Sequence, residues 1–114
     1  MSNDLIDAIR SAMPPDAELR VVNRLPGFDV AVSWKLDDDP ERPNKPSKTI
    51  AISVTDEAAE DFTNASGSEK QDALARLQKF LAQNLRKFDP THSTPKYEPP
   101  PVERWQLTTS VLFG

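Results

Sequence analysis

The chain has 114 residues, of which 37% are apolar and 28% charged, and its formal net charge is −4. A chain of this length buries one core but not two independent ones, so we expect a single domain over residues 1–114. The absence of cysteine excludes disulfides, thiolate metal sites and cysteine nucleophiles.

Neither a secretion signal nor a membrane span is indicated by the sequence. The first residues, "MSNDLIDAIRSAM", lack the basic segment and the continuous apolar run of a signal peptide. Nowhere do about 18 consecutive apolar residues occur. Together with the missing cysteines, these features predict a soluble, acidic, cytoplasmic protein.

The first half of the chain predicts a helix followed by three strands. Apolar residues at helical spacing favour a helix over 3–13, which ends at a proline pair. Period-two alternation then favours a hairpin over 18–36 that turns at Pro26-Gly27. An irregular, proline-containing loop follows over 37–48, and "TIAISVT" at 49–55 predicts the third strand.

The second half predicts helical segments and a closing strand. "DEAAEDFTNA" is helical in pattern, and the helix that follows Gly67 carries an apolar stripe of leucines. Ser68 and Gln71 have the spacing of a capping box at its start. After an irregular segment at 89–101, "VERWQLTTSVLF" alternates as a strand. We therefore predict an α+β fold with the order α-β-β-β-α-β, in which helices pack on one face of an antiparallel four-stranded sheet.

The alternation assigns the strand residues to two faces of the sheet. The face expected to be buried carries Phe28, Val30, Val32, Trp34, Leu36, Ile50, Ile52, Val54, Trp105, Leu107, Val111 and Phe113. The other face is unusually small and nearly neutral along its middle, and it is the candidate interaction face, made of Ala31, Ser33, Ala51, Ser53, Thr108 and Ser110. Such a face either meets water or is covered by a partner.

His92 is the residue on which an acid–base site at neutral pH would have to be built. It lies in the proline-rich segment "FDPTHSTPKYEPPPVERW", which is a poor scaffold for catalytic geometry. A plain loop histidine is the alternative. The segment itself is either an extended connector or a ligand for an aromatic groove in another protein.

The sequence carries no pattern typical of a metal or nucleotide site. Asp37, Asp38 and Asp39 lack the alternating spacing, the glycine and the final glutamate of an EF-hand loop. The phosphate-binding glycine motifs are absent, as is G-x-S-x-G, and the chain has only three glycines. We therefore expect no metal, no cofactor and no catalytic residue set.

Nucleic acid is also an unfavourable partner. The order helix, three strands, helix is similar to that of the double-stranded-RNA-binding fold. However, "TDEAAEDF", which leads into the helices, is acidic where phosphates would have to lie.

Two hypotheses of different kinds follow. The first is a non-catalytic protein-interaction module, such as an adaptor or a chaperone-like protein. Its partner is either another protein or, in a homodimer, a second copy of the chain, and it binds neither nucleic acid nor membrane. Type III secretion chaperones and phage tail-terminator proteins are similar to this chain in size or element order only. The alternative is a small-molecule-binding protein or enzyme that uses His92.

Overall fold

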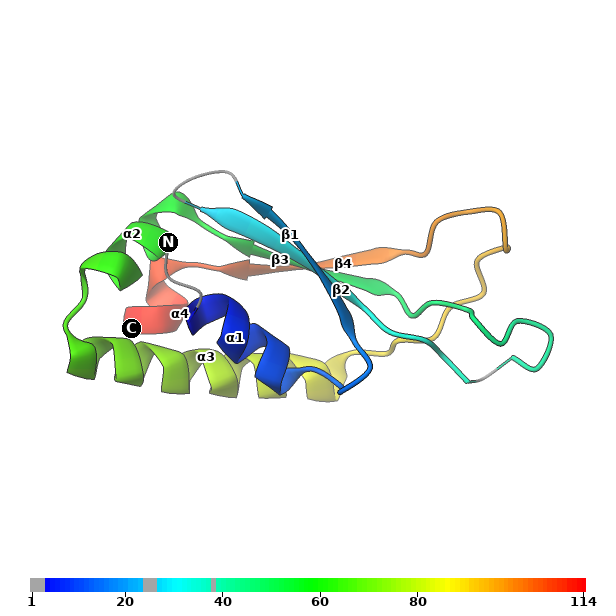
Figure 1. Cartoon of the computed structure of the whole chain (residues 1–114), viewed down its shortest axis with the longest axis horizontal. Coiled ribbons are helices and arrows are strands. Elements are labelled where there is room, and N and C mark those ends of the chain that lie inside the picture. Colours follow the sequence, from blue (N-terminus) through cyan, green and yellow to red (C-terminus); the bar gives the residue numbers. More distant parts are fainter. Residues whose placement is uncertain (1–3, 24–26, 38) are drawn as a thin grey trace.

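The computed structural model describes residues 4–23, 27–37 and 39–114. The elements are, in order, α1 (Asp4–Ala12), β1 (Glu18–Asn23), β2 (Phe28–Ser33), β3 (Thr49–Val54), α2 (Asp56–Asn64), α3 (Gly67–Lys87), β4 (Val102–Leu107) and α4 (Thr109–Phe113). Figure 1 shows α1, α3 and α4 on one side of the sheet. The predicted α+β class with a four-stranded sheet is confirmed.

The sheet is mixed, so the prediction of an antiparallel sheet is wrong for its last strand. The strand order is β1-β2-β3-β4, and β4 runs parallel to β3 while the other pairs are antiparallel. The reason lies in α3, whose 21 residues span about 31 Å and carry the chain back along the sheet. β4 therefore starts beside the start of β3, where Thr49 N–H donates to the Pro101 carbonyl over 2.9 Å.

The core lies between the sheet and the helical layer. Val30 and Ile52 are in register, Ile52 is in register with Trp105, and all three are buried. The predicted inward face is confirmed in β2 and β3, where buried and half-buried residues alternate. The helices contribute Leu5, Ala8, Ile9, Ala58, Ala59, Phe62, Ala73, Leu77, Leu81 and Leu112 to the same cluster.

The hairpin predicted over 18–36 is confirmed in its two strands, and Gly27 directly precedes the second of them. Pro26, the other predicted turn residue, lies outside the described residues. Gly27 is needed for a close approach, because a Cβ there would lie 2.6 Å from the Val54 carbonyl oxygen. Its N–H donates to Asp56 Oδ1 over 3.0 Å, which joins the start of β2 to the start of α2.

The helix α3 begins with a capping box, but not with the predicted one. Ser66 Oγ accepts from the Glu69 N–H over 3.3 Å, and the Glu69 carboxylate accepts from the Ser66 N–H over 3.0 Å. The prediction of Ser68 and Gln71 is wrong because both pairs have the same spacing and the N-cap lies two residues earlier, at Ser66, so that the helix begins at Gly67.

This capping box predicts a pH dependence of stability. Hydrogen bonds from the backbone and then the side chain of Ser66 hold the pKa of Glu69 below its ordinary value of 4.5. The stabilisation is present above the unfolded-state pKa and is lost as the pH falls through the folded-state pKa. Glu69→Gln keeps the acceptor without titrating, so its Tm should fall less than the wild-type Tm between about pH 6 and about pH 3. Thermal unfolding followed by circular dichroism tests this, and equal falls in Tm would contradict it.

The chain ends in a short helix where a strand is predicted. β4 stops at Leu107, Thr108 occupies the N-cap position of α4, and α4 packs against α3 and α2. Val111 and Phe113 are predicted to face the core, yet the fully buried residue is Leu112. Three consecutive apolar residues fit either a strand or a helical turn, and contact with the neighbouring helices selects the turn.

Two irregular segments, the described residues of 37–48 and residues 89–101, form a projection that we call the arm. Figure 1 shows both extending past the end of α3, and they hold eight of the eleven prolines. The segments are joined by hydrogen bonds from Lys48 N–H to the Pro90 carbonyl and from Arg42 Nη1 to the Thr94 carbonyl, each 2.9 Å long. These bonds join the two segments into one cross-linked structure rather than two separate connectors.

Aromatic rings fix the base of the arm. Phe88, which ends α3, lies edge-on to Trp34 with the ring centroids 5.7 Å apart and edge-on to Trp105 with the centroids 6.1 Å apart. Ser47 is fully buried beside them, and its hydroxyl oxygen accepts a hydrogen bond from the backbone N–H of Trp34 over 3.0 Å. Such edge-to-face pairs favour a defined geometry, so the arm leaves the sheet in a fixed direction.

Candidate functional site

The side of the sheet turned away from α1 and α3 is the candidate site, and we call it the open face. Alternation places three side chains from each strand on it. They are Glu18, Arg20, Val22, Asp29, Ala31, Ser33, Thr49, Ala51, Ser53, Val102, Arg104 and Gln106. In β2 and β3 these residues are half-buried, while in β1 and β4 they are exposed.

The structure brings four of the six predicted interaction residues together. Ala31 and Ala51 are in register at the centre of the open face, and Ser33 and Ser53 flank them along their strands. Thr108 and Ser110 are not on this face, because they form the N-cap and the first turn of α4 in the helical layer. The candidate face is therefore confined to the sheet.

The open face is more charged than the sequence suggested. Across the four strands, the residues in register at the centre of this face are Arg20, Ala31, Ala51 and Arg104. Each edge strand therefore contributes a guanidinium group beside the two central alanines. Glu18 in β1 adds a carboxylate. The faces of the first strand were not predicted from its sequence. The alternation of Glu18 and Arg20 with Leu19 and Val21 was the available signal, but only the strand order shows that β1 is an edge strand.

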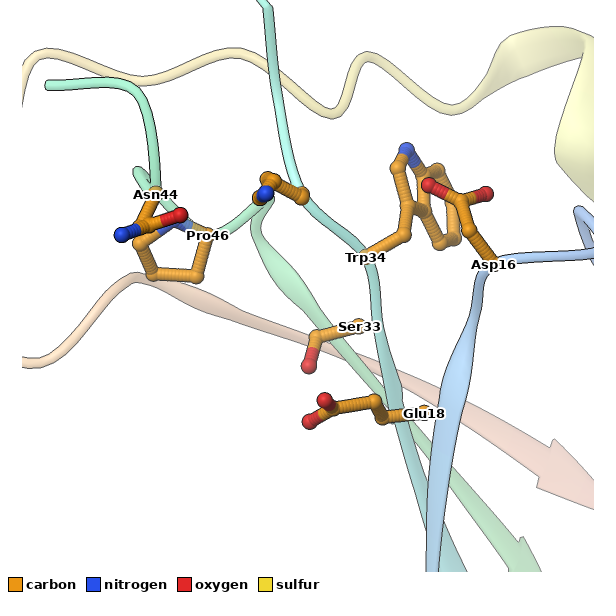
Figure 2. A pocket seen from close by; sticks show the side chains of 7 residues that line it. Asp16, Glu18, Ser33, Trp34, Asn44 and Pro46 are labelled. Atoms are coloured by element: carbon orange, nitrogen blue, oxygen red, sulfur yellow. The ribbon is translucent and has the colours of Figure 1, made fainter.

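One hollow of about 470 Å³ lies where the open face meets the arm. Figure 2 shows Ser33 and Glu18 with their oxygen atoms turned to the same side, Asn44 and Pro46 from the arm, and Trp34 and Asp16 at the other end. The lining combines carboxylates, an amide, a hydroxyl and an indole, which is a surface suited to hydrogen bonding with a polypeptide.

A second hollow of about 650 Å³ adjoins the first, because Glu18 and Ser33 line both. Its other lining residues are Arg10, Ala17, Leu19, Arg20, Ala31 and Thr49. Leu19 belongs to the helix-facing side of β1, whereas Arg20 belongs to the open face. The hollow is therefore bordered by side chains from both faces of β1, and it extends over the small side chains of Ala31 and Ser33 on the open face.

β1 is an edge strand with half-exposed apolar side chains. Its only sheet neighbour among the described strands is β2. Leu19 and Val21 point to the helical side, where they are half-buried, whereas their register partners Val32 and Val30 on β2 are fully buried. Burial is incomplete at β1 because no further strand of residues 4–23, 27–37 and 39–114 covers its outer side.

His92 acts as a link within the arm. Its Nδ1 accepts from the Thr94 N–H over 3.3 Å, so Nε2 carries the proton and donates to the Pro46 carbonyl over 2.8 Å. A substrate could reach a ring nitrogen only by replacing one of these bonds. Nearby, hydrogen bonds from Thr91 lower the pKa of Asp89, and these two residues form a local turn rather than a pair with His92.

The described residues contain neither a cluster of metal-ligating side chains nor a helix suited to span a membrane. Across 4–23, 27–37 and 39–114, no group of three or more histidine and acidic side chains could hold a metal ion. Asp38, from the acidic run considered above, lies outside these residues. Within the same part of the chain, no helix has the length and apolar character to cross a membrane.

Comparison of the chain with protein-family models, with curated proteins and with solved structures found no significant match.

Proposed function

We propose that this protein is a non-catalytic protein-interaction module that binds an extended polypeptide along β1, beside the open face. The observation that carries the proposal is the outer edge of β1, which is flanked by a hollow on the open face and by half-buried Leu19 and Val21 on the helical side. A strand added to such an edge gains backbone hydrogen bonds and covers these apolar side chains.

The edge has few of the features that prevent strand addition. Natural edge strands are protected by proline, by charged side chains, especially lysine, by bulges or by a covering element, and β1 carries the two charged side chains of Glu18 and Arg20. β1 reads "ELRVVN", without proline or lysine, and its six residues pair regularly with β2. Val22, which follows on the open face, is 51% exposed. An edge without proline, lysine or a bulge is suited to recognition of another strand.

The side chains of β1 define the chemistry of the partner. Glu18 and Arg20 lie on the open face two residues apart, with Leu19 between them on the other face. An antiparallel partner strand therefore needs a basic residue opposite Glu18, an apolar residue opposite Leu19 and an acidic residue opposite Arg20. Read from its N-terminus, the partner carries the pattern acidic, apolar, basic.

The four open-face residues predicted from the sequence retain a role in this proposal. Side chains of an added strand lean over its neighbours on the same face of the sheet. Ala31 and Ser33 are small and line the hollow beside β1. Ala51 and Ser53 continue this group of small side chains into β3. A partner whose large side chains reach past the added strand therefore has room on the open face.

Two peptides of equal composition test the proposal. We expect Thr-Thr-Val-Glu-Val-Lys-Thr-Thr to bind about five- to tenfold more tightly than Thr-Thr-Val-Lys-Val-Glu-Thr-Thr, because only the first places opposite charges across from Glu18 and Arg20. The measurement is titration of the labelled protein by NMR. Amide shifts should concentrate in residues 17–22.

A matched variant supplies the control. The double change Glu18→Arg and Arg20→Glu preserves net charge and composition, and it should reverse the preference between the two peptides. Equal affinity of both peptides for both proteins, or shifts concentrated in the arm, would contradict binding at the β1 edge.

A further inference from the structure

We infer that the strand recognised by β1 is β1 of a second copy, so that two chains form an antiparallel pair centred on Leu19. This inference rests on the proposed function and names its partner. The sequence Glu18-Leu19-Arg20 itself has the pattern acidic, apolar, basic that an antiparallel partner of β1 requires. A two-fold axis makes such a contact self-complementary.

Symmetry and the pleat leave few possible registers. Directly opposed residues of an antiparallel pair lie on the same face of the sheet, so a two-fold axis must pass between a residue and its own copy. Centring on Arg20 would oppose two guanidinium groups. Centring on Val21 would place Arg20 opposite the partner's Val22.

The register centred on Leu19 pairs opposite charges twice. Glu18 of each copy then lies opposite Arg20 of the other, which gives two cross-strand ion pairs on the open face. On the helical side, Leu19 meets its own copy and Val21 lies opposite the partner's Ala17. Among symmetric registers, this is the one that opposes charges of different sign within Glu18–Asn23.

The resulting assembly explains the exposure of β1. Leu19 and Val21 are half-buried in one copy, and the added strand would cover the side of each that lies at the outer edge of the described sheet. The sheets of the two copies, four strands each, become continuous and the open faces lie side by side. A contact of one strand buries less than a standard interface, so the dimer should depend on concentration.

A single engineered cysteine tests the register, because the chain has no cysteine of its own. In Leu19→Cys the two sulfurs belong to directly opposed residues, whose Cα atoms lie about 4.5–5.5 Å apart in an antiparallel pair, within disulfide range. In Val21→Cys the two cysteines are offset by four residues, about 14 Å along the strand, and cannot join. Mild oxidation should cross-link Leu19→Cys at least about tenfold faster.

Charge exchange gives a second readout that does not depend on cysteine. Light scattering of the unmodified chain should show an average mass that rises with concentration toward twice the monomer mass. Glu18→Arg alone or Arg20→Glu alone opposes like charges and should weaken the dimer about tenfold, and the double variant should restore it.

The outcomes separate this inference from the proposed function. Cross-linking at Leu19→Cys together with restoration by the double charge exchange supports the dimer. Faster cross-linking at Val21→Cys overturns the register. A monomer at all concentrations, with no cross-linking at either position, overturns self-pairing, and binding of the acidic-apolar-basic peptide would then leave the proposed function standing with a different partner.

Discussion

Leu77→Ala should lower the free energy of unfolding by about 2–5 kcal/mol. Leu77 lies in the middle of α3 and is fully buried in the cluster between the helical layer and the sheet. Removing its isobutyl group loses apolar burial and leaves a cavity that the surrounding side chains fill only in part. Urea unfolding followed by far-ultraviolet circular dichroism measures the change as a lower midpoint with an unchanged slope.

Leu74→Ala is the matched control for this prediction. Leu74 belongs to the same leucine stripe and the same helix, but it is only half-buried. The identical substitution removes less buried surface there, so we expect a loss of about 1 kcal/mol. If both variants lost the same stability, the distinction that the structure draws within the leucine stripe would be wrong.

The difference in burial between Leu77 and Leu74 shows which features of α3 the leucine spacing predicts and which it does not. Period 3.6 identified α3 and its apolar side from the sequence. The position of the sheet relative to that side is a tertiary property, and it separates fully buried Leu77 and Leu81 from half-buried Leu74 and Leu85. The buried surface also includes Ala73, which a search for large apolar residues overlooks.

The fold errors arose where one local pattern fits two structures. Ser66 with Glu69 and Ser68 with Gln71 both match the capping-box spacing, so the start of α3 was displaced. The parallel direction of β4 is not a local property at all. It follows from the length of α3 and from where the arm returns the chain to the sheet.

The candidate site was predictable only in part, and the reason is strand order. Alternation identified the small side chains Ala31, Ser33, Ala51 and Ser53 on one face, and the structure places them together. An edge open to strand addition can be recognised only once the neighbours of β1 are known. Local sequence does not specify those neighbours, so the role of Arg20 could not be derived from it.

Gly27→Ala is expected to be the most damaging change of a single methyl group, lowering the free energy of unfolding by about 2–4 kcal/mol. The added Cβ would lie 2.6 Å from the Val54 carbonyl oxygen and 2.5 Å from Asp56 Oδ1. The first neighbour is backbone at the end of β3 and cannot rotate away. The start of β2 must therefore shift, which also weakens the hydrogen bond from the Gly27 N–H to Asp56.

Gly67→Ala should have the opposite sign, and this makes the pair informative. Among the described residues, no atom outside the neighbouring residues and the adjacent helix backbone lies within 4 Å of a Cβ added at Gly67, which occupies the first turn of α3. Alanine there restricts the unfolded chain and favours the helix, so stability should rise by about 0.4–1 kcal/mol. Urea unfolding of both variants gives the measurement. A neutral Gly27→Ala would mean that Gly27 is not held in close approach to the Val54 carbonyl oxygen.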